Sequence, residues 1–284
     1  MFKKIFFVTA LLLASLLSAK PVVIASIAPV GYLAKAVGGD KIEVQSLAKG
    51  DVHSYEPKPN DMKAVAKARI FIAAGLEFEE AWIPRFKASA KNLVVVQSDA
   101  KIAKLKEERG EQAEHDEKHE AHADPHVWLN PMLAITMARN ISDALIDMDK
   151  ANKDFYLENF QKLMNDLLAF DESAKNELAG LKNRKFVVYH PAWGYFAEHY
   201  DLEQISIERS GKEPKIDEMA STLKMIKDEN IKVIFADPNR SQKSAQILAS
   251  QTGAKVELLD PLGYNLLENL KIAVGAIKDA NSPK

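Results

Sequence analysis

The sequence predicts an α/β protein with two lobes, each built on a roughly four-stranded parallel sheet flanked by helices, and with one long rigid helix joining them. Two observations predict this class. Short apolar runs alternate with helical stretches, as in right-handed βαβ units. One helical stretch is far longer than the others. The length of 284 residues also suits two lobes, at roughly 150 residues per domain.

The strands are predicted from their apolar pattern. Most are short and almost continuously apolar, which is typical of strands buried on both faces of a parallel sheet, and two others alternate apolar and polar residues. The predicted strands are 22–25, 42–47, 70–73, 93–96, 186–189, 202–207, 233–236 and 256–259. Helical stretches between them are 57–68, 79–90, 215–229 and 241–252.

The segment 150–181 interrupts this alternation. It has no proline, its one glycine is Gly180, and its apolar residues recur at helical spacing. A helix of about 30 residues is about 45 Å long, more than one lobe, so we interpret it as a strut between lobes. Two ordinary helices with an unmarked break are the alternative. The predicted organisation is a signal peptide at 1–19, a first lobe at 20–147, a linking helix at 148–181 and a second lobe at 182–284.

The first residues are typical of an export signal. Lys3 and Lys4 precede the apolar run Ile5–Leu17, which is shorter than the ~20 residues that cross a bilayer. A buried first helix is the alternative. The chain contains no cysteine, which excludes disulfides, thiolate metal sites and a lipid-modified cysteine. We therefore expect cleavage after Ala19 and a mature protein that is free in the periplasm, without a lipid anchor.

Charge says little about a large partner. The formal net charge is −2 and neither half carries a basic stripe, so nothing favours nucleic acid or an anionic membrane. The segment 101–124 is rich in charged residues and poor in apolar ones, which predicts a mobile loop. Its histidines His115, His119 and His122 could hold a second, weaker metal ion. A solvated charged loop without metal is the alternative.

Four potential metal ligands lie in short segments that contain proline. His53, His190 and Asp260 follow predicted strands, and His126 precedes a helix. Ligands of parallel α/β sheets bind beyond the carboxyl ends of the strands, and two of these residues belong to each lobe. Three imidazoles and one carboxylate suit tetrahedral zinc at about 2.0–2.2 Å. A single histidine at a strand end is more often not a ligand, so spacing alone leaves this site open.

Several segments together resemble a known family. They are 51–57 (DVHSYEP), 66–75, 124–131 (DPHVWLNP), 188–195 (VYHPAWGY) and 259–262 (LDPL). From Pro21 to about Ile277 the chain resembles the metal-specific solute-binding proteins of ABC importers, and among them the periplasmic zinc-uptake (ZnuA-like) components. The resemblance implies two α/β lobes pinned by a long helix, and metal ligands at His53, His126, His190 and Asp260.

The resemblance also implies a cargo and a partner. Manganese-type relatives place a carboxylate where this chain has His190, and imidazole favours zinc over harder ions. We therefore expect Zn²⁺ as the transported ligand, with Mn²⁺ as the less favoured alternative, a membrane permease as partner, and a monomer. Because neutral imidazole binds the metal, affinity is expected to fall as the pH drops below about 6.5.

Two alternatives come from other classes of protein. Three histidines with an open fourth position could form a hydrolytic zinc site, in which Glu208 or Asp237 would be the candidate base. A surface adhesin could use the metal structurally. We predict a protein that is not an enzyme, because a fourth protein ligand would close the coordination shell. Tyr55 and Glu56 are candidates to support His53 by hydrogen bonding.

Overall fold

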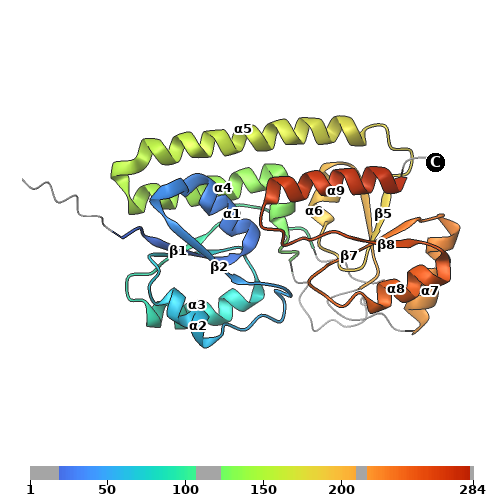
Figure 1. The fold of residues 1–284 in the computed structure, drawn as a ribbon, viewed down its shortest axis with the longest axis horizontal. Helices are drawn as coiled ribbons and strands as arrows, with labels where there is room; N and C mark the ends of the chain where they lie inside the picture. The colour runs from blue at the N-terminus through green and yellow to red at the C-terminus, as the bar shows by residue number, and fades with distance from the viewer. Residues whose placement is uncertain (1–18, 107–122, 209–215, 282–284) are drawn as a thin grey trace, which may run out of the picture.

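The computed structural model describes residues 19–106, 123–208 and 216–281. These residues form two lobes that lie side by side, and the long helix α5 (Lys153–Leu178) runs along both of them (Figure 1). Each lobe contains one four-stranded sheet in which all strands are parallel. The predicted fold class is therefore confirmed. No helix of the described residues is long and apolar enough to cross a membrane.

The first lobe is built on a sheet with the strand order β2-β1-β3-β4. Its strands are β1 (Val22–Ile27), β2 (Glu43–Ala48), β3 (Ile70–Ala73) and β4 (Val94–Gln97). Helices α1 and α4 cover one face and α2 and α3 the other (Figure 1). Their bounds are α1 (Ala28–Gly38), α2 (Pro59–Val65), α3 (Glu77–Ser89) and α4 (Pro131–Met148).

The second lobe repeats this topology with the strand order β6-β5-β7-β8. Its strands are β5 (Lys185–Val188), β6 (Glu203–Ser206), β7 (Val233–Ala236) and β8 (Lys255–Leu258). Its helices are α6 (Gly194–His199), α7 (Ile216–Asp228), α8 (Lys243–Thr252) and α9 (Leu266–Asn281). Every predicted strand is confirmed to within two residues at either end. The carboxyl ends of the strands carry the loops that hold the histidines.

Helices α1, α6 and α9 are not among the helices that the sequence patterns predict. Helix α1 contains Pro29, Gly31 and Gly38, which are loop signals in most contexts. The structure explains Gly31, because a Cβ atom there would lie 2.4 Å from Ser46 Oγ on strand β2. The absence of a side chain at this position lets the helix pack closely on the sheet beside Ser46.

The predicted strut 150–181 is a 3-10 turn (Lys150–Asn152) followed by α5. The helix buries an apolar stripe at helical spacing, which includes Tyr156, Phe160, Leu163 and Leu167. This stripe packs on α1 and α4 of the first lobe and on α9 of the second. One helix thus contributes to the cores of both lobes.

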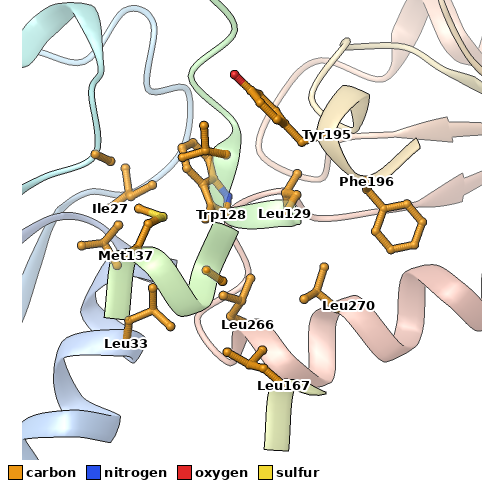
Figure 2. Packing of buried hydrophobic residues seen from close by; sticks show 14 of the residues in the cluster. Ile27, Leu33, Trp128, Leu129, Met137, Leu167, Tyr195, Phe196, Leu266 and Leu270 are labelled. Carbon is orange, nitrogen blue, oxygen red and sulfur yellow. The ribbon is translucent and has the colours of Figure 1, made fainter. Parts of the chain in front are cut away.

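The two lobes share one continuous apolar core. Trp128 and Leu129 lie between Ile27 and Met137 on one side and Leu266 of helix α9 on the other (Figure 2). The indole Nε1 of Trp128 donates a hydrogen bond to the carbonyl oxygen of Pro261, at 2.8 Å, across the junction. A wide opening of the lobes would expose this apolar surface at about 25 cal/mol per Å². We therefore expect only small relative motions of the lobes.

Candidate metal centre

Three histidines meet at the junction of the lobes. One ring nitrogen from each of His53, His126 and His190 lies within 4.8 Å of the others. The ring centroids are 5.8 Å apart for His53 and His126, 5.2 Å for His53 and His190, and 5.4 Å for His126 and His190. Tetrahedral coordination at about 2.0–2.1 Å needs nitrogens about 3.4 Å apart, so small ring movements suffice to bind one ion.

The loop that carries His53 is fixed by Asp51. The chain leaves strand β2 at Ala48, and the carboxylate of Asp51 then accepts hydrogen bonds from the backbone N–H of His53, at 3.1 Å, and from Ser54 Oγ, at 3.0 Å. An aspartate that binds the backbone two residues later is a common way to close a turn. The sequence therefore sets the direction of the His53 side chain locally.

The segment of His126 is fixed in a similar way. The Oδ1 atom of Asp124 accepts the backbone N–H of His126 at 2.9 Å. A 3-10 turn (Val127–Leu129) follows, and Asn130 then caps helix α4 by accepting the backbone N–H of Met132 at 2.9 Å. This buried, capped segment leaves His126 little freedom, since its exposed fraction is 4%.

His190 follows strand β5, two residues past its end. Its backbone carbonyl accepts a hydrogen bond from Ala192 at 2.8 Å, and the Gln204 side chain accepts the backbone N–H of Trp193 at 2.6 Å. These bonds hold a short Pro191-containing turn before helix α6. Strand β5 is central in the second sheet, so His190 projects from the middle of its carboxyl edge.

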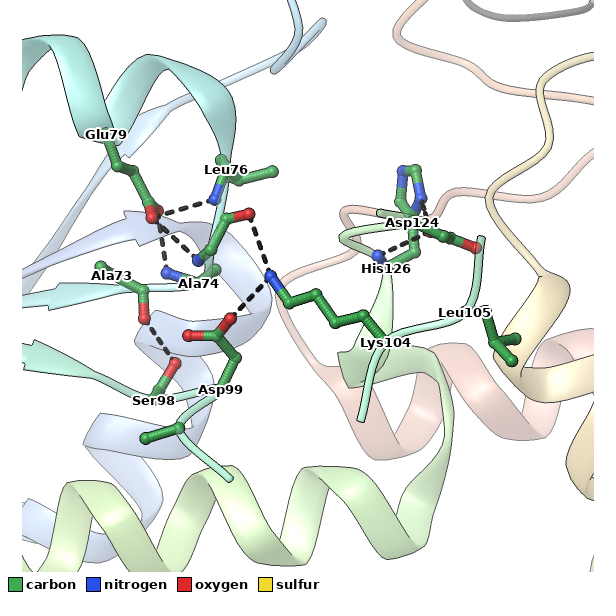
Figure 3. A network of polar contacts seen from close by, with 12 residues as sticks. Ala73, Ala74, Leu76, Glu79, Ser98, Asp99, Lys104, Leu105, Asp124 and His126 are labelled. Atoms are coloured by element: carbon green, nitrogen blue, oxygen red, sulfur yellow. Dashed lines mark hydrogen bonds and ion pairs between the residues drawn. The ribbon is translucent and has the colours of Figure 1, made fainter. Parts of the chain in front are cut away.

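Two of the three imidazole rings have a carboxylate on Nδ1. His126 Nδ1 lies 2.7 Å from Asp124 Oδ1 (Figure 3), and His190 Nδ1 lies 3.1 Å from Glu208 Oε2. A carboxylate at this position favours the tautomer that carries its proton on Nδ1 and its lone pair on Nε2. This arrangement orients many histidines that bind metals, and it makes Nε2 the better donor.

His53 differs, because its buried Nε2 atom has no hydrogen-bond partner among the described residues. An unpaired buried polar atom lowers the free energy of unfolding by about 1–3 kcal/mol, and such atoms are rare unless they bind a ligand. Burial, followed by the nearby His126 and His190, lowers the pKa of His53 to about 4. The ring is therefore neutral at physiological pH, which is the form that binds metal.

His190 is also biased toward its neutral form. Burial lowers its pKa, although the hydrogen bond that His190 donates to Glu208 acts in the opposite direction. For Glu208, burial alone would raise the pKa of the carboxyl group, but the contacts with His190 and Arg240 outweigh it and the pKa is lowered. Glu208 is therefore an ionised acceptor for the Nδ1 proton of His190.

Arg240 binds the carboxylates that support two of the histidines, and the sequence analysis missed it. Its Nη1 atom donates to both carboxylate oxygens of Glu208, at 2.7 and 2.8 Å, and its Nη2 atom donates to Asp51 Oδ1 at 2.8 Å. One signal in the sequence could have found it, because Arg240 follows strand β7 by four residues and so lies at the same sheet edge as His190.

The two residues considered as catalytic bases are both engaged. Glu208 is bound to His190 and Arg240, as described above. The Oδ1 atom of Asp237 accepts hydrogen bonds from the backbone N–H of Asn239, at 2.7 Å, and from the side-chain amide of Asn239, at 3.0 Å. Burial raises the pKa of Asp237. Each of these carboxylates therefore has a structural partner.

Asp260, the expected fourth ligand, lies outside the group formed by the three histidines. Its Oδ1 atom accepts hydrogen bonds from the side-chain amide of Asn239 at 2.8 Å and from the backbone N–H of Leu262 at 2.9 Å. The side chain is half-buried and follows strand β8 at the same sheet edge as His190.

The support expected for His53 comes from a different residue. The hydroxyl of Tyr55 donates to Asp61 at 2.9 Å, and Glu56 is exposed. Asp51 instead holds the His53 backbone. His115, His119 and His122 lie outside the described residues.

Two parallel α/β lobes, a long helix across both and a histidine cluster at their junction are the features of a two-lobed solute-binding protein. The family of zinc-uptake complex component A, periplasmic, matches this chain over residues 23–280. The chain belongs to this family, which confirms the resemblance found in the sequence.

Individual relatives agree with this assignment. The high-affinity zinc uptake system protein ZnuA of Bacillus subtilis (strain 168) is 30% identical over 279 residues, which are 91% of this chain and 86% of that protein. A crystal structure of ZnuA has a TM-score of 0.86 and 35% identity, and the match covers 93% of this chain and 100% of that chain. A manganese-bound periplasmic metal-binding protein from Candidatus Liberibacter asiaticus has a TM-score of 0.79 at 20% identity over 93% of this chain and 100% of that one. This last similarity shows the fold alone.

Proposed function

We propose that this protein is a periplasmic solute-binding protein that captures Zn²⁺ between its lobes and delivers it to an ABC importer. His53, His126 and His190 bind the ion, and Asp260 completes the shell. The observation that carries the proposal is the convergence of three imidazoles from both lobes: two are buried, and the third, half-buried one has a buried ring nitrogen without a partner among the described residues. Family membership and the zinc-uptake relative support it.

The donor set favours zinc over manganese. Three imidazole nitrogens suit a borderline ion such as Zn²⁺, whereas Mn²⁺ prefers sites rich in oxygen. The carboxylates of Asp124 and Glu208, which contact two of the histidines, are bound to ring Nδ1 atoms and are thus held back from coordination. Manganese remains the alternative cargo within the same class of protein.

Asp260 would join the shell through a small local change. Its Oδ1 atom is held by Asn239 and Leu262, and Oδ2 is the atom left to approach a bound ion. With this oxygen, the site has the four ligands of a closed zinc shell. The ion then bridges the lobes, because His53 and His126 come from the first lobe and His190 and Asp260 from the second.

A hydrolytic zinc enzyme receives less support. Such an enzyme needs an open coordination position together with a general base that can reach the attacking water. The two candidate bases, Glu208 and Asp237, are bound by Arg240 and Asn239 respectively. We therefore propose that the protein is a carrier and not a catalyst.

The rest of the proposal follows the transport role. The segment 1–19 is removed on export, the mature protein is a free monomer in the periplasm, and the loaded form docks on a membrane permease. The domain boundaries belong to the same proposal: a first lobe at 20–147, a linking helix at 148–181 and a second lobe at 182–284. The loop histidines His115, His119 and His122 would supply a second, weaker zinc site.

Titration of the metal-free protein with zinc and manganese tests this function. We expect one tight zinc site, much weaker manganese binding, and a partial loss of zinc affinity in Asp260→Ala. A matched control is Asp228→Ala, an exposed carboxylate on helix α7. Absence of tight zinc binding, or hydrolysis of esters that a chelator abolishes, would reject the carrier function.

A further inference from the structure

The Arg240 guanidinium connects the two halves of the histidine cluster. On one side it binds Glu208, which is bound to Nδ1 of His190 in the second lobe. On the other side it binds Asp51, which holds the backbone of His53 in the first lobe. The Asp51–Arg240 contact joins residues that are 189 positions apart in the sequence. One side chain therefore lies between the supports of two histidines from different lobes.

The geometry of these contacts uses the shape of arginine. Nη1 faces the carboxylate of Glu208 and contacts both of its oxygens, while Nη2 contacts Asp51 Oδ1. The planar guanidinium can serve two carboxylates in fixed directions, which a lysine ammonium cannot reproduce. Asp51 Oδ1 also accepts the backbone N–H of His53. The same oxygen is therefore hydrogen-bonded to both the His53 loop and Arg240.

Burial makes these contacts stronger than an ordinary surface ion pair. The side chains of Glu208 and Arg240 are 5% and 15% exposed, and that of Asp51 is 35% exposed. Exposed pairs contribute little, but charged hydrogen bonds away from water are stronger and strongly directional. Removal of Arg240 would leave the Glu208 carboxylate buried without its cationic partner.

We propose that Arg240 is a positioning residue that ties the two lobes together at the metal site and sets the relative placement of His53 and His190. The tether consists of contacts between protein side chains alone. The hydrogen bonds of Arg240 go to Glu208 and Asp51, which in turn hold His190 and His53. It acts through Asp51 and Glu208. The inference about metal rests on the proposed zinc-binding function, whereas the tether itself does not.

Two effects of Arg240 on a bound cation oppose each other. Its positive charge repels the ion, whereas its hydrogen bonds place two of the ligands. Loss of groups that orient metal ligands typically costs 10–100-fold in affinity, and the neighbouring carboxylates already offset the charge of Arg240. We therefore expect positioning to dominate. The variants Arg240→Gln and Arg240→Lys separate the two effects, because lysine keeps the charge but not the forked geometry.

The first measurement uses the metal-free protein. The chain has no cysteine, so Lys67→Cys and Lys227→Cys, both at exposed positions, allow one spin label on each lobe. We expect a narrow distribution of label distances in the parent protein and a broader one in Arg240→Gln. Lys185→Gln is the matched control, because it removes a cation that pairs with Glu229 at the opposite end of strand β5. An unchanged distribution in Arg240→Gln would overturn the tether.

The second measurement is zinc affinity by competition with a chelator. We expect a 10–100-fold loss in Arg240→Gln, a comparable loss in Arg240→Lys, and no change in Lys185→Gln. Asp51→Asn combined with Arg240→Gln should cost little more than Arg240→Gln alone, because both act through one contact. Full affinity in Arg240→Lys would show that only the charge matters and would reject positioning. A parent protein that binds no zinc would reject the proposed function, and the label distances would still decide the tether.

Discussion

The two carboxylates that orient histidines differ in how they are held. Asp124 belongs to the same short segment as His126 and contacts both its backbone N–H and its ring. Glu208 lies 18 residues from His190 and is itself bound to Arg240, which reaches Asp51 in the other lobe. The His126 side of the site is thus organised locally, whereas the His190 side depends on how the lobes are placed. The following tests examine this difference.

Removal of a histidine should have the largest effect, whichever lobe it comes from. Either His126→Ala or His190→Ala removes one of the three proposed nitrogen ligands. We expect zinc affinity to fall by more than about 100-fold, beyond the loss seen for groups that only orient ligands. Isothermal titration against a competing chelator measures this. The melting temperature of the metal-free protein serves as the control for folding. A loss of less than tenfold would place the bound ion elsewhere.

Substitution of the two carboxylates that orient histidines should show how the two sides of the site differ. Asp124→Asn keeps an acceptor for the His126 backbone, and we expect a loss of about tenfold in zinc affinity. Glu208→Gln weakens the contacts with both His190 and Arg240, and we expect a loss nearer 100-fold together with a lower melting temperature. The same titrations, run side by side, compare them. Equal losses would show that the cross-lobe contact adds nothing to ligand placement.

The sequence predicted the strands and the histidines that follow them better than the side-chain contacts between the lobes. Strand runs such as 70–73 and 233–236 are recognisable because parallel strands are buried on both faces. Histidines after such strands must meet at one edge of each sheet, so His190 and His53 could be placed near a common site. The convergence of three histidines is therefore understandable from local patterns and topology.

The pairing of Arg240 with Asp51 could not be predicted in this way. It depends on the relative orientation of the lobes, which the packing of α5, α9 and Trp128 determines and which leaves no local pattern. The orientation of Asp260 was hidden for a related reason. A turn and the Asn239 amide set the direction of its carboxylate, and both are details of side-chain geometry.

The pH dependence of zinc binding should be shifted from the value expected for ordinary histidines. Burial lowers the pKa of His53 to about 4 and also lowers that of His190. A ring with a lowered pKa stays neutral to a lower pH, so protons compete with zinc for these rings only well below the ordinary value of about 6.5. The sequence predicts a fall that begins near pH 6.5, whereas the effect of burial on these two rings predicts that they are protonated at a lower pH.

Because burial lowers the pKa of His53 to about 4, we expect protonation of this ring to reduce zinc affinity only as the pH falls toward about 4. The metal-free protein should also lose stability as the pH falls from about 6.5 toward 4, because the unfolded chain takes up protons before the folded chain does. Competition titrations and thermal melts over this range measure both. A fall in affinity centred near 6.5 would contradict the effect of burial on His53.

The smallest expected effect concerns the apolar junction that keeps the lobes together. Trp128 is fully buried, and Trp128→Phe removes its hydrogen bond to the Pro261 carbonyl and part of its packing volume. We expect a loss of about 1–3 kcal/mol in the free energy of unfolding, measured by urea denaturation, and little change in zinc affinity. Trp82→Phe is the control, because Trp82 is half-buried on helix α3 and should cost less. A large loss of zinc affinity in Trp128→Phe would mean that this packing, and not the Arg240 contact, places the histidines of the two lobes.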